Sequence, residues 1–257
     1  MQASAEEVLV ISDIDDTLKI SHVLDPLDVI ANGLRTDSYF LGTNLVLEKL
    51  MQQNSQAKLY YVSNAVRWMM NGRHEKFILE NHFPRGEVLL RESLSEKNFK
   101  LEMIGTLVRR HTPQVLILVG DNGEKDALIY EAIRLQFPKL RVLTAIHLVY
   151  STQWGDQVGQ PLRPGQRSWV TAIDLAKIWK KEGFLDSAAL NELGGRLTMM
   201  MLGQNMNSAH GAIAFPKWMD CRDVFSQPLQ PNPEKFVWAR AYSDLMLERC
   251  LSSFDGA

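Results

Sequence analysis

The chain has 257 residues, of which 46% are apolar and 23% charged, and its formal net charge is −2. This length can build one generous domain, or a core domain with a sizeable annex. The near-neutral charge argues against a nucleic-acid-binding protein, which usually carries a basic excess. No apolar run approaches the roughly 18 residues of a membrane span, so we expect no transmembrane segment.

The cellular location has two interpretations. Cys221 and Cys250 lie far apart without a CxxC spacing, which excludes a paired-cysteine metal site and allows at most one disulfide. The start, Met1-Gln-Ala-Ser-Ala5, lacks the basic and apolar regions of a signal peptide, yet it resembles what remains after a signal is removed. We expect a cytoplasmic protein, with export after removal of a signal as the alternative.

Strands and helices alternate through the first part of the chain. Apolar positions are continuous rather than alternating in the predicted strands, which is typical of strands buried on both faces. These strands are residues 7–12, 57–62, 86–90, 115–119 and 140–146, and helical periodicity is found at 43–53, 66–81, 99–110 and 124–136. This order predicts an α/β fold with a doubly wound, Rossmann-like parallel sheet and helices on both faces.

The pattern changes after His147. Gly and Pro cluster at 155–165, and helical periodicity follows at 168–181, 187–201 and 233–250 without strand alternation. We therefore predict one domain over residues 1–150 and a mainly helical C-terminal annex over 151–257 that packs on it.

One apolar face in the annex has two interpretations. Trp169, Ile173, Ala176 and Trp179 lie on one side of the predicted helix 168–181. Packing against a core is favoured, and peripheral contact with a membrane is the alternative.

Polar side chains gather where the predicted strands end, which is where ligands bind in such sheets. The first strand is followed by Asp13, Asp15, Asp16 and Thr17, the second ends in Ser63-Asn64, the fourth is followed by Gly120 to Asp126, and Lys100 opens the preceding helix. Three carboxylates within four positions repel one another and are costly to desolvate, so something cationic is expected there.

Phosphate chemistry explains this set of residues. A carboxylate that attacks a phosphate dianion faces a repulsion of about 4 kcal/mol at a separation of about 4 Å for an effective dielectric near 20. A bound Mg²⁺ ion would cancel this repulsion. Mg²⁺ prefers one or two carboxylates plus water and substrate oxygens as ligands, and Asp13 and Asp121 could be these carboxylates. Lys100 and Ser63 would hold the remaining phosphate oxygens. The sequence therefore predicts a metal, a nucleophile and a phosphate cradle at one edge.

Four motifs carry a resemblance to a known family. Asp13-Ile-Asp-Asp-Thr-Leu18, Tyr61-Val-Ser-Asn64, Lys100 and Gly120-Asp-Asn-Gly-Glu-Lys-Asp126 resemble, in order, the motifs of the haloacid dehalogenase (HAD) superfamily. Within it the chain is most similar to the catalytic domain of the actin-patch-protein type of phosphatidate phosphatase, from about Val8 to Ile146. This similarity includes Phe83-Pro-Arg-Gly86 and Leu89-Leu-Arg91.

The resemblance implies a covalent mechanism. Asp13 would be the nucleophile that forms an aspartyl-phosphate, and Asp15 the general acid and then the base for water. Ser63 and Lys100 would bind the phosphoryl group. Thr17 would support the first turn. Asn64 would either contact phosphate or metal or only form a turn.

The resemblance also implies Mg²⁺ as cofactor. Its ligands would be Asp13, the backbone carbonyl of Asp15, and Asp121, with Asp126 orienting its waters. Lys97 competes with Lys100 for the lysine role. Lys100 is preferred because it starts an amphipathic helix and its separation of 121 − 100 = 21 residues from Asp121 suits one helix plus one strand.

Several site features depart from the family or remain open. The family pattern has Ser-Asn-Ser-Pro-Trp and Gly-Asp-Ser, where this chain has Ser63-Asn-Ala-Val-Arg67 and Gly120-Asp-Asn122, so the substrate stays open. Asp16 is expected to be a turn or cap residue, and Asn122 either touches phosphate or metal or forms a turn. The six histidines show no HExxH or paired spacing, so surface or core roles are expected for them.

The motif spacing predicts an uncapped site. The gaps of 63 − 15 = 48 and 100 − 63 = 37 residues are mostly consumed by predicted helices and strands, so no large cap fits. Unless the annex covers it, an open site favours a phosphate on a bulky partner. A lipid headgroup such as that of phosphatidate is favoured, with phosphoprotein and nucleic-acid or nucleotide ends as alternatives.

Two alternatives to a phosphatase use similar residues. A phosphoacceptor signalling domain places its phosphorylated Asp on a later strand and its lysine last, whereas Lys100 precedes Asp121 here. A non-catalytic scaffold would require a broken motif, and none is broken. We therefore expect an enzyme, a phosphomonoester hydrolase.

Overall fold

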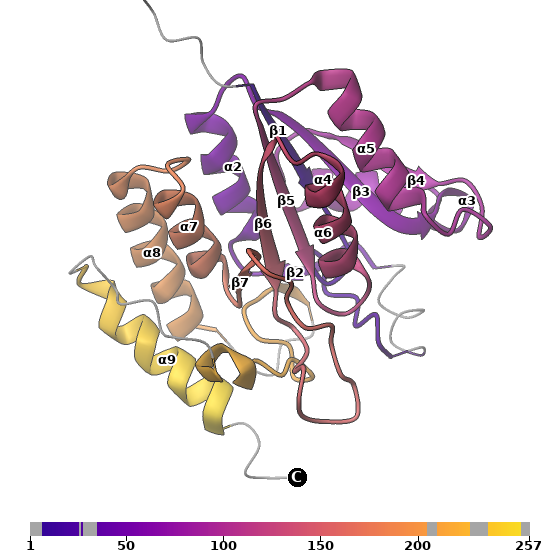
Figure 1. Cartoon of the computed structure of the whole chain (residues 1–257). Coiled ribbons are helices and arrows are strands. Elements are labelled where there is room, and N and C mark those ends of the chain that lie inside the picture. Colours follow the sequence, from indigo (N-terminus) through magenta and orange to yellow (C-terminus); the bar gives the residue numbers. More distant parts are fainter. Residues whose placement is uncertain (1–6, 26, 28–34, 205–209, 227–235, 253–257) are drawn as a thin grey trace, which may run out of the picture.

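A six-stranded parallel sheet forms the centre of the protein (Figure 1). The computed structural model describes residues 7–25, 27, 35–204, 210–226 and 236–252. The strand order is β4-β3-β1-β5-β6-β7, with β1 Val8–Ser12, β3 Lys58–Val66, β4 Glu87–Arg91, β5 Val115–Asp121, β6 Arg141–His147 and β7 Arg167–Trp169. Every residue of the central strands β1 and β5 is buried, which explains their unbroken apolar sequence.

Helices cover both faces of this sheet (Figure 1). Alternate residues of β1 point to opposite faces of the sheet. Leu9 and Ile11 belong to the core on one face, and Val8 and Val10 belong to the larger core on the other face. The first face is covered by α5 Phe99–His111 and α6 Asp126–Gln136, and the second by α2 Thr43–Gln53, α4 Arg73–Glu80, α7 Ala172–Lys181 and α8 Ser187–Leu202. The predicted doubly wound α/β fold is therefore confirmed.

Two predicted helices differ in detail from the structure. The helix expected over 66–81 is broken into α3 Arg67–Met70 and α4, because Asn71 and Gly72 adopt left-handed φ values of 44° and 74°. The helix expected from 168 begins only at Ala172, because Arg167–Trp169 pairs with β6 and Thr171 and Asp174 form a capping box.

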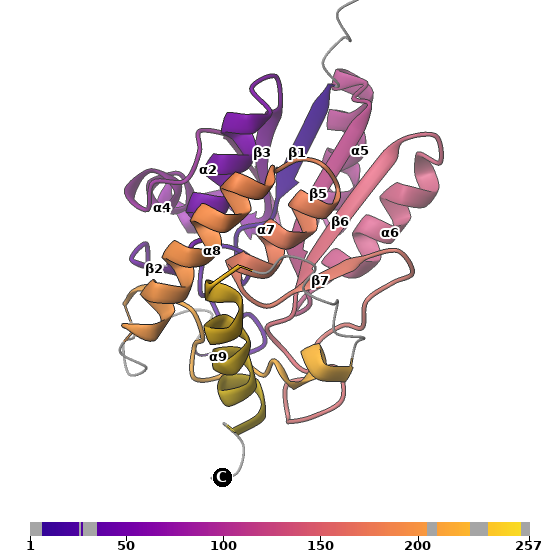
Figure 2. The ribbon, with the colours of Figure 1, turned by 90° about the vertical axis from the view of Figure 1, so that its left-hand side faces the viewer.

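The C-terminal region shares the core of the sheet. The strand β7 extends the sheet, and β8 Gly211–Ile213 pairs with β2 Ser38–Phe40, so two short strands occur in a region for which no strand was predicted. Figure 2 shows α7 and α8 against the sheet and α9 Trp238–Ser252 across α8. The division into domains at residue 150 stays a prediction.

The structure shows how the apolar face of the annex and its two cysteines are used. Trp169, Ile173, Ala176 and Trp179 are buried, so this face packs into the core and the membrane interpretation of it is wrong. No helix among the described residues is long and apolar enough to cross a membrane. A disulfide joins Cys221, just before the 3₁₀ helix Arg222–Ser226, to Cys250 in α9.

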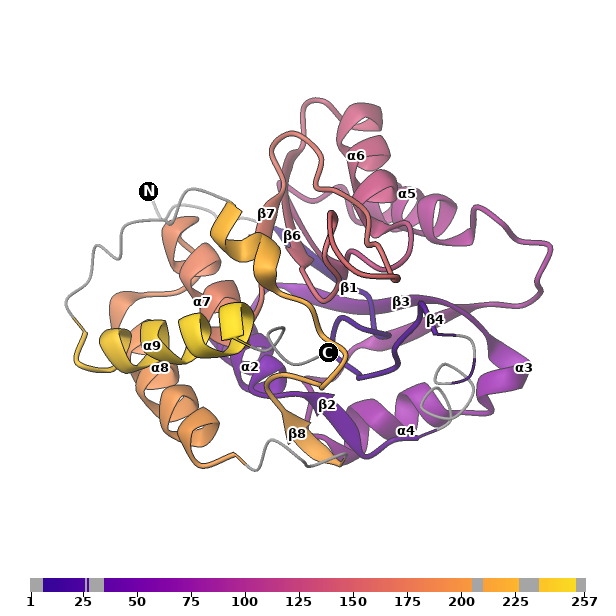
Figure 3. The ribbon, with the colours of Figure 1, turned by 90° about the horizontal axis from the view of Figure 1, so that it is seen from below.

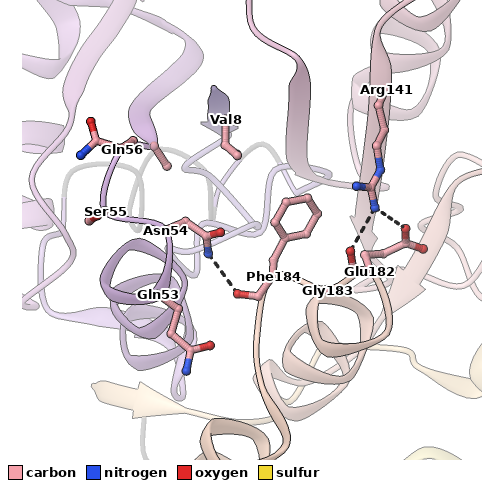
Figure 4. Close-up of a pocket in the computed structure, with 10 residues that line it drawn as sticks. Val8, Gln53, Asn54, Ser55, Gln56, Arg141, Glu182, Gly183 and Phe184 are labelled. Carbon is pink, nitrogen blue, oxygen red and sulfur yellow. Dashed lines mark hydrogen bonds and ion pairs between the residues drawn. The ribbon is translucent and has the colours of Figure 1, made fainter. Parts of the chain in front are cut away.

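A cavity of about 310 Å³ lies at the amino edge of the sheet (Figure 4). Val8 and Arg141, the first residues of β1 and β6, line it together with Gln53 and Phe184. Arg141 donates to the backbone oxygen of Glu182 at 3.0 Å, and Asn54 donates to that of Phe184 at 3.0 Å. These contacts tie α2, α7 and β6 together at the edge opposite the predicted site.

Candidate functional site

The loop after β1 is organised by Asp16. The backbone N–H of Asp13 donates to Val119 O at 2.8 Å, and the chain then turns through Asp16, whose φ is 55°. The Asp16 carboxylate accepts hydrogen bonds from the backbone N–H groups of Ser21, His22 and Val23 at 2.7–2.9 Å and from the Tyr150 hydroxyl at 2.6 Å. Asp16 is thus the turn residue that was predicted, and its hydrogen bonds hold the turn that follows Asp13 and Asp15.

Three carboxylates and one lysine meet at the carboxyl edge of the sheet, which Figure 3 views end-on. Carboxylate oxygens of Asp13, Asp121 and Asp126 lie within 4.8 Å of one another, and all three residues are buried. Lys100 Nζ contacts Asp13 Oδ1 at 2.7 Å and Asp126 Oδ1 at 2.5 Å. Thr17 donates its hydroxyl to Asp13 Oδ2 at 3.0 Å. The predicted lysine Lys100 is therefore inside the cluster, whereas Lys97 is exposed.

This cluster carries more negative than positive charge. Burial raises the pKa of Asp13 well above its usual range, even though Lys100 opposes the shift. Burial, Asp126 and Asp13 raise the pKa of Asp121 in the same way. Burial lowers the pKa of Lys100, but the adjacent Asp126 and Asp13 outweigh it and raise that pKa. Because the possible ligands are all carboxylate oxygens and an added cation would favour their ionised forms, the set fits a hard divalent ion such as Mg²⁺.

Asp15 has different surroundings from the triad. Its carboxylate accepts from Ser21 Oγ at 2.7 Å and from Ser63 Oγ at 3.2 Å. His74 Nε2 lies 3.2 Å away, and Lys19 Nζ lies 3.9 Å away. Burial raises the pKa of Asp15, but the electrostatic interactions with His74 and Lys19 and the hydrogen bonds to the carboxylate outweigh it and hold that pKa far below its usual range. Asp15 is therefore an ionised carboxylate at neutral pH.

An open cavity of about 340 Å³ leads to these residues. Its polar lining includes Asp13, Asp15, Ser63, Asn64 and Asp121, so side chains from three strand ends share one space. Asn64 donates to Glu124 Oε2 at 3.3 Å across this lining. Every lining residue lies between Asp13 and Glu124, so no described residue of the annex lines the cavity.

Several residues of the site were not predicted from the sequence. His74 and Lys19 set the charge state of Asp15, and the buried Tyr130 donates to Val119 O at 3.0 Å and contacts Asp126 Oδ2 at 3.2 Å. Gly120 is required beneath them, because a Cβ there would lie 2.2 Å from Asp126 Oδ2. A histidine in the middle of the helical pattern 66–81 gives no local sign of such a contact.

Asn122, left open by the sequence, holds a neighbouring loop. Its amide donates to Tyr150 O at 2.6 Å and accepts from the N–H groups of Val149 and Tyr150 at 3.1 Å each. With these bonds the fully buried side chain is occupied as a loop anchor.

Comparisons with known proteins place this site in a family context. Residues 8–147 match the profile of the family described as "Phosphatidate phosphatase APP1, catalytic domain". Phosphatidate phosphatase APP1 of Saccharomyces cerevisiae is 29% identical over 140 residues, which are 50% of this chain and 24% of that protein, so the match spans about a quarter of the relative's length.

Similarity to solved structures is weaker. A structure of the Pnkp1/Rnl/Hen1 RNA repair complex gives a TM-score of 0.39 at 18% identity, covering 57% of this chain and 44% of the other. A dTDP-glucose 4,6-dehydratase from Bacillus anthracis gives a TM-score of 0.31 at 9% identity, covering 69% and 51%. At these scores the similarity supports no conclusion about function.

Proposed function

Because the chain belongs to the family of phosphatidate phosphatase APP1 catalytic domains, we propose that it is a phosphatase that hydrolyses a phosphomonoester at the carboxyl edge of its sheet. The observation that carries the proposal is the contact of Lys100 Nζ with Asp13 Oδ1 at 2.7 Å inside the buried triad of Asp13, Asp121 and Asp126. A buried carboxylate held by a lysine and a hydroxyl, and reached by an open cavity, suits a nucleophile.

The mechanism we propose is of the HAD type. Asp13 attacks the phosphorus, a P–O bond forms to its carboxylate, and the bond to the leaving alcohol breaks, which gives an aspartyl-phosphate. Lys100 and Thr17 keep Asp13 in one orientation. Asp15 then takes the proton of the water that attacks the intermediate, a role that requires it to be ionised beforehand. Protonation of the leaving alcohol by the same residue requires that Asp15 first receive a proton.

Mg²⁺ is the cofactor we propose. Asp13, Asp121 and Asp126 would hold it, together with the backbone carbonyl of Asp15. When bound, the ion supplies the positive charge that the triad lacks and that an incoming phosphate dianion requires. Addition of EDTA should abolish activity, and Mg²⁺ should restore it.

For the substrate, we propose a phosphate on an amphiphilic molecule such as phosphatidate. One wall of the cavity is apolar and is formed by Val66, Met69, Met70 and Leu94. Met69 and Leu94 are 51% and 64% exposed, and the adjacent Trp68 is 71% exposed, so large apolar side chains lie together at the rim of this polar site. This wall supports a lipid over the phosphoprotein and nucleotide alternatives.

The test is phosphate release from 4-nitrophenyl phosphate, dioctanoyl phosphatidate, a phosphopeptide and a 3′-phosphorylated oligonucleotide. Asp13→Asn should reduce turnover by about a thousandfold or more, because the nucleophile is removed. Asp156→Asn, an exposed aspartate in the segment after β6, is the matched control and should keep wild-type turnover. Equal turnover in wild type and Asp13→Asn would refute the function, and a stable phosphoprotein in place of turnover would favour a phosphoacceptor domain.

For location, we propose an oxidising compartment, against the cytoplasmic expectation. The Cys221–Cys250 disulfide supports this alternative, because disulfides persist mainly in exported proteins. Thiol labelling of the native protein in its own cell would test it. Two free thiols would favour the cytoplasm.

A further inference from the structure

We propose that Arg91 binds the phosphate of the substrate at the open side of the cavity. The inference rests on the proposed phosphatase function and adds a substrate-binding residue to it. Arg91 is the last residue of β4, where it pairs in register with Val66 of β3. It lines the same cavity as Asp13, Ser63 and Asp121. Its backbone is thus placed by the sheet, next to the strand that carries Ser63.

The Arg91 guanidinium has no partner among the described residues. Its Nε is buried without a hydrogen bond, and no ion pair of the described chain includes it. The nearby Arg67 differs, because its Nε lies 2.7 Å from Glu92 Oε1 and its Nη1 lies 3.8 Å from Glu75 Oε1. The buried Nε lacks an acceptor, which is costly, while the residue as a whole is only half-buried, so an anion could reach the guanidinium from the cavity and would be stabilised there.

Other basic groups near the site are already paired. Lys100 contacts two carboxylates, and Lys19 lies 3.9 Å from Asp15 Oδ1. Within the described lining of the cavity, Arg91 is the one basic side chain, and it faces a space that Asp13, Asp15, Asp121 and Glu124 make negative. Among the side chains that line this cavity, Arg91 is therefore the one cation that an entering phosphate dianion would meet, whereas Lys100 lies behind Asp13.

The chemistry of the side chain suits this role. A guanidinium presents parallel N–H donors that match two phosphate oxygens, which an ammonium group cannot reproduce. The neighbouring Met69, Met70 and Leu94 make one side of the cavity apolar, and a substrate that covers this side would strengthen a charge-assisted hydrogen bond. Arg91 would hold the phosphate while this apolar wall contacts the rest of the substrate.

The test compares Arg91→Ala and Arg91→Lys with Arg67→Ala, the nearby arginine that does not line the cavity. Kinetics with 4-nitrophenyl phosphate should show KM about 10- to 100-fold higher in Arg91→Ala, with kcat within about threefold of wild type, since a hydrogen bond to a charged group is lost. Arg91→Lys should give an intermediate KM, because lysine keeps the positive charge but lacks the two parallel N–H donors of the guanidinium. Arg67→Ala should match wild type.

A parallel titration separates this inference from the proposed function. Inorganic phosphate is titrated into each folded variant in Mg²⁺ buffer by calorimetry, and Arg91→Ala should bind it at least about 10-fold more weakly than wild type. If the wild type hydrolyses no phosphomonoester, the proposed function fails, and this titration alone decides the role of Arg91. Equal phosphate affinity in Arg91→Ala and Arg67→Ala, or a fall in kcat with an unchanged KM, would overturn the inference.

Discussion

Replacing Asp121 by asparagine should make the metal-free protein more stable while removing its response to Mg²⁺. Oxygens of Asp13, Asp121 and Asp126 lie within 4.8 Å of one another, and Lys100 contacts the other two but not Asp121 at hydrogen-bond distance. Each like-charge pair at that separation repels by about 3 kcal/mol for an effective dielectric near 20. Asparagine also keeps the Oδ1 acceptor for the Gly123 N–H at 2.6 Å.

The net gain follows from these opposing interactions. Removing the Asp121 charge relieves two repulsions and loses one attraction to Lys100, which leaves about one repulsion. Because burial, Asp126 and Asp13 raise the pKa of Asp121, part of this is already relieved by a bound proton at neutral pH. We therefore expect Asp121→Asn to add about 1–3 kcal/mol to the free energy of unfolding in EDTA at pH 8.

The raised pKa of Asp121 also predicts how the stability of the wild type changes with pH. The unfolded chain releases the Asp121 proton near pH 4, whereas the folded chain retains it until its raised pKa, so wild-type stability falls as pH rises through that interval. The advantage of Asp121→Asn should be near zero at pH 4 and should grow toward pH 8.

Urea unfolding at pH 4, 6 and 8, with EDTA or with Mg²⁺, measures these effects. Mg²⁺ should stabilise the wild type and leave the variant unchanged. Asp16→Asn is the control, since its carboxylate accepts four hydrogen bonds and its loss should cost about 2–4 kcal/mol. If Asp121→Asn were less stable than wild type in EDTA at pH 8, the charge-crowding account of the triad would be refuted.

Three further changes test the surroundings of the site. Replacing Cys221 and Cys250 by serine should lower the free energy of unfolding by about 3–4 kcal/mol, since a loop of 29 residues is released; an unchanged urea midpoint would contradict this. Burial lowers the pKa of His147 to about 4, so stability should fall by about 3 kcal/mol as pH drops from 6.5 to 4, and His147→Gln should remove that dependence in paired urea titrations. Asn122→Ala should cost about 2–4 kcal/mol and speed amide exchange in the segment after β6, because three hydrogen bonds are lost; unchanged exchange would count against its anchoring role.

The helices and strands that a local sequence pattern specifies were predictable. The helix Thr43–Gln53 and all five predicted strands are present, because buried parallel strands require unbroken apolar runs that can be read directly. Asp13, Ser63 and Asp121 were expected at one edge, since the carboxyl ends of parallel strands converge there, and the cavity that they share lies at that edge.

Contacts between distant segments were not predictable in the same way. His74 shows no local motif, yet its Nε2 lies 3.2 Å from Asp15 Oδ2. The break at Asn71 and Gly72 that orients its helix depends on left-handed backbone angles that helical periodicity hides. Strands β7 and β8 are each three residues long, too short for alternation to be detected.

By itself, the sequence determined which side chains follow which strands, and with that a parallel sheet with acids, a hydroxyl and a lysine at one edge. The tertiary structure alone decided their charge states and partners: Lys100 is bound between Asp13 and Asp126, Asp15 is held ionised, and Arg91 faces the cavity without a partner. The reason is that the positions of strands and helices depend on periodicity along the chain, whereas a pKa or an ion pair depends on distances and burial between segments that only folding brings together.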